Sequence, residues 1–157
     1  MEERYTLRRA AAQDKEFLRR LFEETEQSLQ ALPPELRGAL MEMQYRGREM
    51  TYSAQYPEAE SWILCLQNGT AAGRHMVARQ PNGFHEIDLA VLPEYQGRGL
   101  GTFALQELQR RARAEGVGVT LNVAKTNQAE RLYTRMGFEW ISEDEVFRHM
   151  AWNEAKL

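Results

Sequence analysis

One short segment constrains the fold of this chain more than any other, a glycine-rich turn between an apolar run and a helical pattern. Residues 92–102 read Leu-Pro-Glu-Tyr-Gln-Gly-Arg-Gly-Leu-Gly-Thr. Glycines at alternate positions let the backbone turn sharply and approach a ligand closely. The apolar run at 84–92 and the helical spacing at 101–115 make the segment a predicted strand–loop–helix unit.

The position of this loop predicts an anion site. The free N–H groups and the positive dipole end of the following helix point at the loop, and such a site holds phosphate or pyrophosphate. A P-loop would need a lysine after its last glycine, whereas Thr102 follows Gly101 directly. A dinucleotide fingerprint would need Gly-x-Gly-x-x-Gly in a parallel unit, and the spacing here is Gly-x-Gly-x-Gly. A glycine-rich turn without a ligand stays open.

The remaining residues predict helices placed between the strands of one sheet. Short turns at Asn68-Gly69, a two-residue hairpin signal, and at Pro81-Asn82-Gly83 predict an antiparallel meander. Asn127 and Glu130 resemble a capping box, and Gly137 closes that helix. The expected elements are strand 4–9, helices from about 14 to 29 and 34 to 50, strands 61–67, 70–79 and 84–92, helix 101–115, strand 117–123, helix 127–136, and strands 138–141 and 146–152.

This pattern predicts an α/β (α+β) fold in the order β-α-α-β-β-β-α-β-α-β-β, with a mixed, mostly antiparallel central sheet flanked by helices. We expect residues 1–157 to form a single domain, since hydrophobic residues make up 43% of the chain and charged residues 27%. The net charge of −3 argues against nucleic acid as a partner. No apolar stretch could span a bilayer and no secretory signal is visible, so we expect a cytoplasmic protein without a membrane partner.

Cysteine and histidine indicate neither a disulfide nor a metal site. Cys65 is the only cysteine and lies in an apolar run, which predicts a core residue and not a nucleophile. His75, His85 and His149 lie far apart, without the spacing of metal ligands. The sequence therefore predicts chemistry without a metal.

Two motifs resemble the GNAT family of acetyl-CoA-dependent N-acetyltransferases. Gln96-x-x-Gly99-x-Gly101 resembles the family's acetyl-CoA signature, Arg/Gln-x-x-Gly-x-Gly/Ala, and the preceding Leu89-Ala90-Val91-x-Pro93 is similar to its central strand. Residues 127–138, Asn-Gln-Ala-Glu-Arg-Leu-Tyr-Thr-Arg-Met-Gly-Phe, resemble the family's later helix and the strand after it. The predicted element order fits the family along nearly the whole chain.

The resemblance implies how acetyl-CoA would bind. Backbone groups of Leu89 and Val91 would pair with the pantetheine arm as an added strand does, and the loop N–H groups would hold the pyrophosphate. Asn127 would bond the cofactor or cap its helix. The implied cofactor-binding residues are Leu89, Val91, Gln96, Gly97, Arg98, Gly99, Leu100, Gly101, Thr102, Asn127, Ala129 and Tyr133.

The implied reaction needs an acid and a base, and the sequence offers candidates for both. Tyr133 would face the thioester sulfur and protonate the leaving thiolate, unless it is a core tyrosine. For the base we rank Asp88 first, Glu86 second and His85 third, with a structural role open for each. Regular alternation would place Glu86 with Asp88 and His85 with Leu89, and a bulge, which this family often has there, would shift that parity.

The sequence favours a small-molecule primary amine as acceptor, and the resemblance implies that this amine attacks acetyl-CoA directly in a ternary complex. Ribosomal-protein N-terminal acetyltransferases of the family carry Glu where this chain has Asn122, and asparagine cannot act as a base. The alternative is an acyl-CoA-binding sensor without turnover. Monomer and homodimer both stay open. A set of Met and Tyr residues would either line an acceptor pocket or form core and helix surface: Met41, Met43, Tyr45, Met50, Tyr52 and Tyr56.

Overall fold

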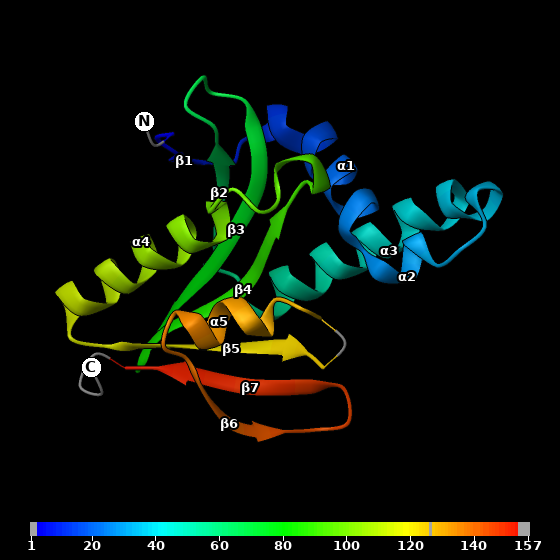
Figure 1. Cartoon of the computed structure of the whole chain (residues 1–157). Helices are drawn as coiled ribbons and strands as arrows, with labels where there is room; N and C mark the ends of the chain where they lie inside the picture. The colour runs from blue at the N-terminus through cyan, green and yellow to red at the C-terminus, as the bar shows by residue number, and fades with distance from the viewer. Residues whose placement is uncertain (1–2, 126, 154–157) are drawn as a thin grey trace.

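A seven-stranded sheet in the order β1-β2-β3-β4-β5-β7-β6 runs through the computed structural model, which describes residues 3–125 and 127–153 (Figure 1). The elements are β1 (Thr6–Arg9), η1 (Ala12–Asp14), α1 (Lys15–Thr25), α2 (Gln27–Gln30), α3 (Pro34–Gln55), β2 (Glu60–Cys65), β3 (Ala71–Gln80), β4 (Gly83–Val91), η2 (Pro93–Tyr95), α4 (Leu100–Glu115), β5 (Gly118–Ala124), α5 (Glu130–Arg135), β6 (Glu139–Glu143) and β7 (Phe147–Trp152). The predicted mixed, mostly antiparallel sheet with helices between its strands is confirmed.

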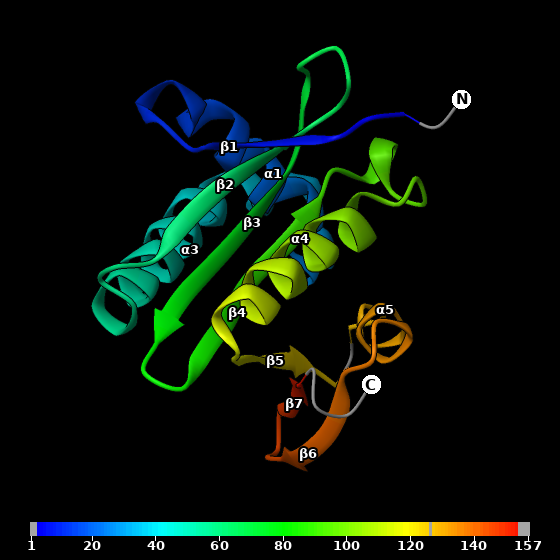
Figure 2. The same ribbon diagram turned by 90° about the vertical axis from the view of Figure 1, so that its left-hand side faces the viewer.

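The one parallel pair among the described strands is β4 with β5, and every other neighbouring pair is antiparallel. Parallel neighbours need a crossover, and α4 provides it between these two strands. Figure 2 shows α4 and α5 on one face of the sheet and α1 and α3 on the other. The sheet is therefore a middle layer, and a residue on a central strand faces one or the other helical layer.

The main core lies between the sheet and the α4–α5 layer. Its buried residues come mainly from β3, β4, β5, β7 and both helices: Val77, Phe84, Leu105, Leu108, Ala112, Val119, Leu121, Val123, Tyr133, Phe138, Met150 and Trp152. The predicted four-residue repeat on α4 is buried along its length, from Leu100 to Ala112. Cys65 is 2% exposed, which confirms it as a core residue.

The first predicted helix, 14–29, is two helices, because the backbone leaves helical geometry at Glu26 (φ −75°, ψ 113°). The side chain of Gln30 donates to the carbonyl of Glu23 across the break. The break accompanies complete burial of Leu29. Beyond it, α3 runs from a projecting N-terminal end back to the sheet without a buried residue, and Met43 and Met50 are exposed (Figure 1). No described helix combines the length and apolar character needed to cross a membrane.

One predicted turn differs from the structure, the connection between β2 and β3. This connection closes on a Leu66–Thr70 backbone pair, so its loop has three residues and not two. Gly69 adopts a positive φ (+90°), whereas Asn68 keeps a negative φ. The Asn68 side chain accepts a hydrogen bond from the Thr70 N–H. Type I′ geometry would need positive φ at both residues.

The predicted capping box before α5 is also wrong. Asn127 Oδ1 accepts from the Ala129 N–H (2.8 Å), so it stabilises a turn ahead of the helix, which begins at Glu130. The Glu130 carboxylate instead pairs with Arg148 of β7 (2.7 Å). Gly137 (φ +92°) follows the helix end as expected. The tertiary partner on β7 therefore takes the carboxylate that a local cap would have used.

A bulge in β4 decides which way its acidic residues face. Met76 of β3 pairs with Asp88, whereas Val77 pairs with Glu86, so Ile87 is an extra residue on β4. Directly opposed residues share a face, and Val77 belongs to the core beneath α4. Glu86 therefore faces the α4–α5 layer, and Asp88 faces the α1–α3 layer. A regular strand would have placed both acids on one face.

We expect Leu105→Ala to lower the free energy of unfolding by about 2–5 kcal/mol, because Leu105 is fully buried in the core and truncation leaves a cavity. Urea denaturation at an unchanged m-value measures the loss. The matched control is Leu36→Ala on α3, 49% exposed, which should change stability by less than about 0.5 kcal/mol. Equal losses in the two variants would contradict the assigned core.

Candidate active site

β4 and β5 pair over their first halves and then separate. Their ladder runs from Gly83–Gly118 to Glu86–Leu121, and β4 then continues to Val91 while β5 continues beside β7 alone. The sheet thus opens into a V beyond Glu86. The backbone groups of β4 that face this opening have no strand partner, and an extended ligand carrying amide groups can bind there as an added strand does.

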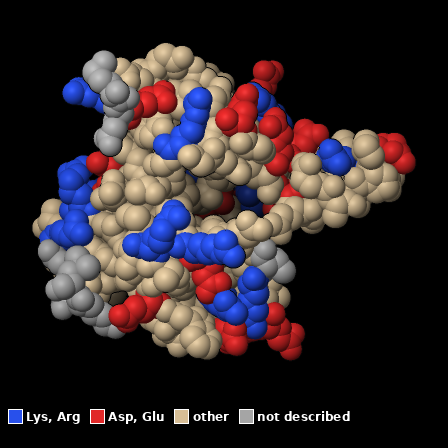
Figure 3. Space-filling model, in the orientation of Figure 1, with Lys and Arg blue, Asp and Glu red and all other residues tan. Residues whose placement is uncertain are grey.

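A cleft of about 910 Å³ occupies the opening. One wall consists of β4, β5, the turn before α5 and α5, and the other consists of the ends of α1 and α2 with α3. Figure 3 shows the surface hollowed at this place, between the body of the sheet and the projecting helices. Eight predicted site residues line the cleft: Glu86, Asp88, Leu89, Val91, Gln96, Asn127, Ala129 and Tyr133.

The glycine-rich loop meets the cleft through Pro93 and Gln96. Gly97 and Gly99 have φ values of +78° and +86°, a conformation that other L-residues rarely adopt. The first N–H bonded within α4 is that of Phe103, to the Gly99 carbonyl (2.9 Å). By helix geometry the N–H groups of residues 100–102 precede it without an intrahelical partner, and the helix dipole adds positive potential. The loop has the features of an anion site.

Side chains of the loop brace its shape. Gln96 Nε2 donates to the Val91 carbonyl (2.9 Å), which ties the loop to the end of β4. The Tyr5 hydroxyl donates to the Arg98 carbonyl (2.5 Å), and the Arg98 guanidinium lies 5.6 Å from the centroid of the Tyr95 ring. The side chain of Gln96 therefore positions the backbone that would meet the ligand.

Asp88, the first-ranked base candidate, is engaged in ion pairs. The buried Arg74 side chain, 2% exposed, donates from Nη2 to Asp88 (3.0 Å) and from Nη1 to Glu49 (2.7 Å). Arg48 lies 4.0 Å from the same Asp88 oxygen. Burial would lower the pKa of Arg74, but the two carboxylates raise it above its ordinary value. Asp88 thus balances a buried guanidinium, and removing it would take away one of the two charges that pair with that group.

Glu86, the second-ranked candidate, is buried beneath α4 and bonded on one side only. Its Oε2 lies 2.5 Å from His75 Nε2, while Oε1 is buried without a hydrogen-bond partner. Burial raises the pKa of Glu86, and the nearby His75 opposes that shift. The residue lines the cleft where the two strands part, and Oε1 is the carboxyl oxygen that has no hydrogen-bond partner there.

His85, the third candidate, lies away from the cleft. Its ring stacks on Tyr56, which follows α3 (5.5 Å between centroids), and Nδ1 is 2.8 Å from Thr120 Oγ1. Burial, and then the charge of His149, lower the pKa of His85. The structure therefore does not bring His85 together with the other predicted site residues.

Tyr133 lies in the core and in the cleft wall at once. It is 6% exposed, packs edge-on against Phe138 with ring centroids 5.9 Å apart, and lines the cleft. Burial, and then the charges of Glu86 and Asp88, raise the pKa of Tyr133 well above its ordinary value. The phenol therefore keeps its proton at neutral pH, and it can donate a hydrogen bond to a group that gains negative charge.

The opposite wall carries acidic and aromatic side chains. Glu24 and Glu26 line it from α1 and the break before α2, and acidic side chains gather over α1 beside the hollow (Figure 3). Tyr52 is the one member of the predicted Met and Tyr set that lines the described cleft. Burial, and then the charge of Asp88, raise the pKa of Tyr52 to about 12. Arg48 of α3 lies on the same wall, so this wall carries charges of both signs.

Sequence reasoning missed three residues of the site, His75, Arg74 and Arg48, whereas it had offered Tyr52 as a candidate for lining an acceptor pocket. A signal existed for the first two, since adjacent polar residues interrupt the apolar run of a predicted central strand and must face opposite buried layers. No local signal connects Arg48 and Tyr52 of α3 with β4, because only the packing of α3 on the sheet brings them there.

Comparison with known proteins agrees with this geometry. The family model described as "Acetyltransferase (GNAT) family" matches residues 16–138 of the chain. The chain belongs to the GNAT family of acetyltransferases. Membership in this family implies acetyl transfer from acetyl-CoA, and the cleft with its glycine loop fits a CoA-type co-substrate of such a GNAT enzyme. Among curated proteins, none matches the sequence.

Solved GNAT structures share the fold at low sequence identity. The PaiA N-acetyltransferase of Thermoplasma acidophilum, crystallised with coenzyme A, aligns with a TM-score of 0.75 at 17% identity, over 96% of this chain and 99% of that chain. A GCN5-related N-acetyltransferase from Rhodopseudomonas palustris gives 0.70 at 20% identity, over 98% of both chains. An acetyltransferase from Thermus thermophilus gives 0.69 at 18%, over 95% of this chain and 96% of that chain. At these identities the likeness shows the fold.

We expect Gly99→Asp to weaken coenzyme A binding by about a hundredfold or more, because it adds a negative charge beside the N-terminus of α4. Gly99→Asn is the matched control, since asparagine has the same shape without the charge and both residues tolerate the positive φ. The control should bind within about tenfold of the wild type. Calorimetric titration measures both, and equal affinities in folded variants would overturn the loop assignment.

Proposed function

We propose that this enzyme transfers the acetyl group of acetyl-CoA to a small cationic primary amine by direct attack in a ternary complex. The observation that carries the proposal is the cleft between β4 and β5, with an anion-binding loop at one end and a buried carboxyl and phenol where the strands part. No cysteine supports an acyl-enzyme route, since Cys65 is buried outside the cleft lining.

The described residues fit acetyl-CoA from one end of the cleft to the other. The N–H groups of Gly97 through Thr102 would hold the pyrophosphate. The edge of β4 at Leu89 and Val91, which has no strand partner on that side, would bond the pantetheine amides, with Asn127 and Ala129 on the facing side. The thioester would then lie beside Tyr133, at the point where the two strands meet.

The acceptor would occupy the part of the cleft walled by α1, α2 and α3. Glu24 and Glu26 there attract a positively charged amine, while the charge of Asp88 deeper in the cleft is balanced by Arg74. Asn122 supports a small molecule over a protein N-terminus. Its amide lines the cleft bonded to His149 (2.5 Å), and it cannot take up a proton.

The first requirement of the chemistry is removal of a proton from the ammonium. An amine of pKa ~10.4 is less than about a thousandth free base at pH 7, and a placed base contributes roughly 10²–10⁴-fold. We rank Glu86 ahead of Asp88 for this role, because Glu86 Oε1 has no partner while Asp88 is held by Arg74. Backbone N–H groups on the open edge of β4 would stabilise the oxyanion.

The second requirement is stabilisation of the departing thiolate. A thiol of pKa ~8.5 is a stronger acid than a buried phenol, so complete proton transfer from Tyr133 is disfavoured. The hydroxyl of Tyr133 would instead donate a hydrogen bond to the sulfur as negative charge develops there. Its high pKa keeps that donor in place over the working pH range.

Calorimetric titration with acetyl-CoA, joined to a thiol-release assay over a panel of amines, tests the function. Binding with amine-dependent thiol release is the expected result, with small diamines and alkylamines ahead of peptide N-termini. Binding without release on any amine would favour an acyl-CoA sensor over an enzyme. Absence of binding would overturn the cleft assignment itself.

We expect Tyr133→Phe to lower kcat by about tenfold or more while acetyl-CoA affinity stays within about twofold, since the change removes one hydroxyl and keeps the packing against Phe138. Steady-state kinetics and calorimetry separate the two quantities. Phe138→Leu perturbs the same contact without touching a donor, and it serves as the packing control. An unchanged kcat in Tyr133→Phe would remove the phenol from the reaction.

A further inference from the structure

A buried pair of titratable residues connects the cleft with a second cavity of the molecule. His75 of β3 and Glu86 of β4 are each 3% exposed and meet at 2.5 Å through Nε2 and Oε2. The remaining oxygen of Glu86 is buried without a partner, and the residue lines the cleft. An unpaired buried carboxyl oxygen costs free energy, so its retention points to a use.

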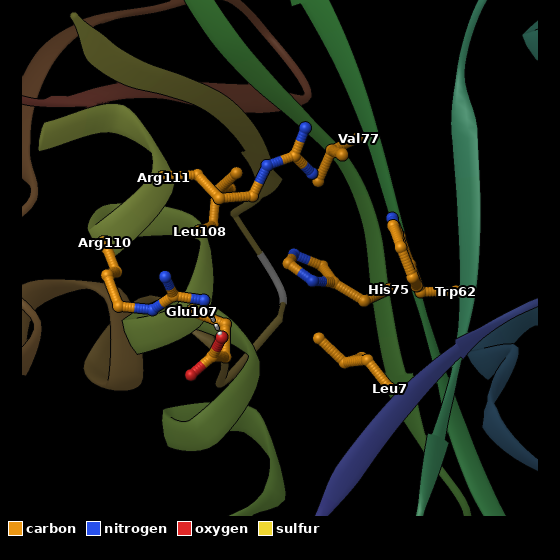
Figure 4. A pocket seen from close by; sticks show the side chains of 8 residues that line it. All are labelled: Leu7, Trp62, His75, Val77, Glu107, Leu108, Arg110 and Arg111. Atoms are coloured by element: carbon orange, nitrogen blue, oxygen red, sulfur yellow. Dashed lines mark hydrogen bonds and ion pairs between the residues drawn. The ribbon is translucent and has the colours of Figure 1, made fainter. Parts of the chain in front are cut away.

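The second cavity is lined by His75 and is separate from the cleft. It has a volume of about 190 Å³ and lies between β1, β2, β3 and α4. Its lining residues are Leu7, Trp62, His75, Val77, Glu107, Leu108, Arg110 and Arg111. Figure 4 shows the His75 ring pointing from its strand toward α4, with the arginines on the far side. Arg110 is 68% exposed, so the wall of this α4 cavity reaches solvent.

The two openings thus meet at one hydrogen-bonded pair. Glu86 is in the wall of the cleft and His75 is in the wall of the α4 cavity. Among the described residues that line the cleft, Glu86 alone has a side-chain hydrogen bond to His75. A proton that passes through the pair therefore leaves the cleft on the side of the sheet away from α1 and α3.

We propose that Glu86 and His75 form a proton relay, which carries the proton of the acceptor ammonium from the cleft to water in the α4 cavity. The inference rests on the proposed acetyl transfer and assigns its proton exit. Glu86 is the catalytic residue of the relay, because it would touch the ammonium. His75 acts through Glu86 and is a positioning and relay residue.

The relay balances as one proton in and one proton out. Before transfer the pair shares a proton on Glu86 Oε2, and neutral His75 carries its own proton on Nδ1. The ammonium gives a proton to Oε1, Oε2 gives its proton to Nε2, and Nδ1 releases its proton to a water molecule. Three bonds to hydrogen form and three break, and the pair stays neutral overall. Rotation of the carboxyl group and tautomer exchange restore the starting state.

The electrostatic surroundings suit a neutral pair. Burial raises the pKa of Glu86, the nearby His75 opposes that shift, and the negative charge of Asp88 adds to it. The net rise favours a proton shared between Glu86 and His75 over a separated ion pair. The titratable groups of the elements packed around the pair are Asp88 of β4, Tyr133 of α5, Glu107, Arg110 and Arg111 of α4, and Glu60 of β2, which pairs with Arg111. Arg110 pairs with Glu107, and Arg111 pairs with Glu60. These charges balance one another, so none of them holds the relay in a fixed charge state.

Replacement of His75 followed by chemical rescue tests the proposal. We expect His75→Ala to lower kcat at pH 7 by about tenfold to a hundredfold, with the loss shrinking toward pH ~10 as the free amine becomes abundant. The KM for acetyl-CoA should stay within about twofold. Imidazole added to the variant should restore kcat several-fold, because the enlarged cavity beside α4 admits it.

A second rescuing molecule separates proton transfer from space filling. 1-Methylimidazole has nearly the size of imidazole but only one nitrogen that can carry a proton, so it can fill the cavity and cannot relay. We expect imidazole to restore activity and 1-methylimidazole to fail. Equal rescue by both compounds, or an unchanged kcat and pH profile in His75→Ala, would overturn the relay.

Two further variants keep the test decisive. His75→Gln fills similar space and can donate to Glu86 but cannot pass a proton, so it should show the same loss of kcat and pH dependence if the alanine variant does not fold. His85→Ala, a histidine change on the neighbouring strand outside the cleft lining, should leave kcat within about twofold. Wild-type enzyme without transfer on any amine would deny the proposed function, whereas active wild type with an unaffected His75→Gln would deny the relay alone.

Discussion

The separation of β4 from β5 beyond Glu86 is the constraint on which the rest of the site depends. A parallel ladder that continued to Val91 would pair the backbone groups of β4 internally and leave no edge for a ligand. β5 can leave β4 because β7 pairs with it from Val119 to Ala124. α4 can cross between the two strands because the loop before it turns through two glycines with positive φ. The cleft, the anion site and the open strand edge therefore all depend on the separation of β4 from β5.

The bulge at Ile87 lies beside this opening and sets the directions of two acidic side chains. It directs Asp88 toward the α1–α3 layer, where Arg74, Arg48 and Glu49 form a paired network around it. It leaves Glu86 beneath α4 with His75. Two acidic residues that are close in sequence thus enter separate polar networks, one held by ion pairs and one with a free carboxyl oxygen. Buried polar groups are costly unless paired, so the network around Glu86 is the one where a ligand can complete the bonding.

Solved GNAT structures share this framework at identities of 17%, 20% and 18%, so the fold itself does not distinguish one acceptor from another. The residues that bear on the acceptor lie on the cleft walls. Glu24 and Glu26, at the break between α1 and α2, line one wall of the cleft, and α3 contributes Tyr52 and Arg48 to the same wall, across from β4. Asn122 and His149 bond to each other on the β5 side. The negative charges of Glu24 and Glu26 support the proposed small cationic acceptor beside a CoA-type thioester.

The sequence by itself determined the element order, the apolar faces and the glycine loop, because each follows from local spacing and backbone preference. The helical repeat on α4 and the burial of Cys65 needed no knowledge of distant residues. The direction of Glu86 and Asp88 did not follow, since a one-residue bulge inverts the alternation and leaves no local mark. The pairing of Glu130 with Arg148 and that of His75 with Glu86 likewise depend on residues from separate elements. Only the tertiary structure decided them, because strand register and layer packing set which polar groups are buried together.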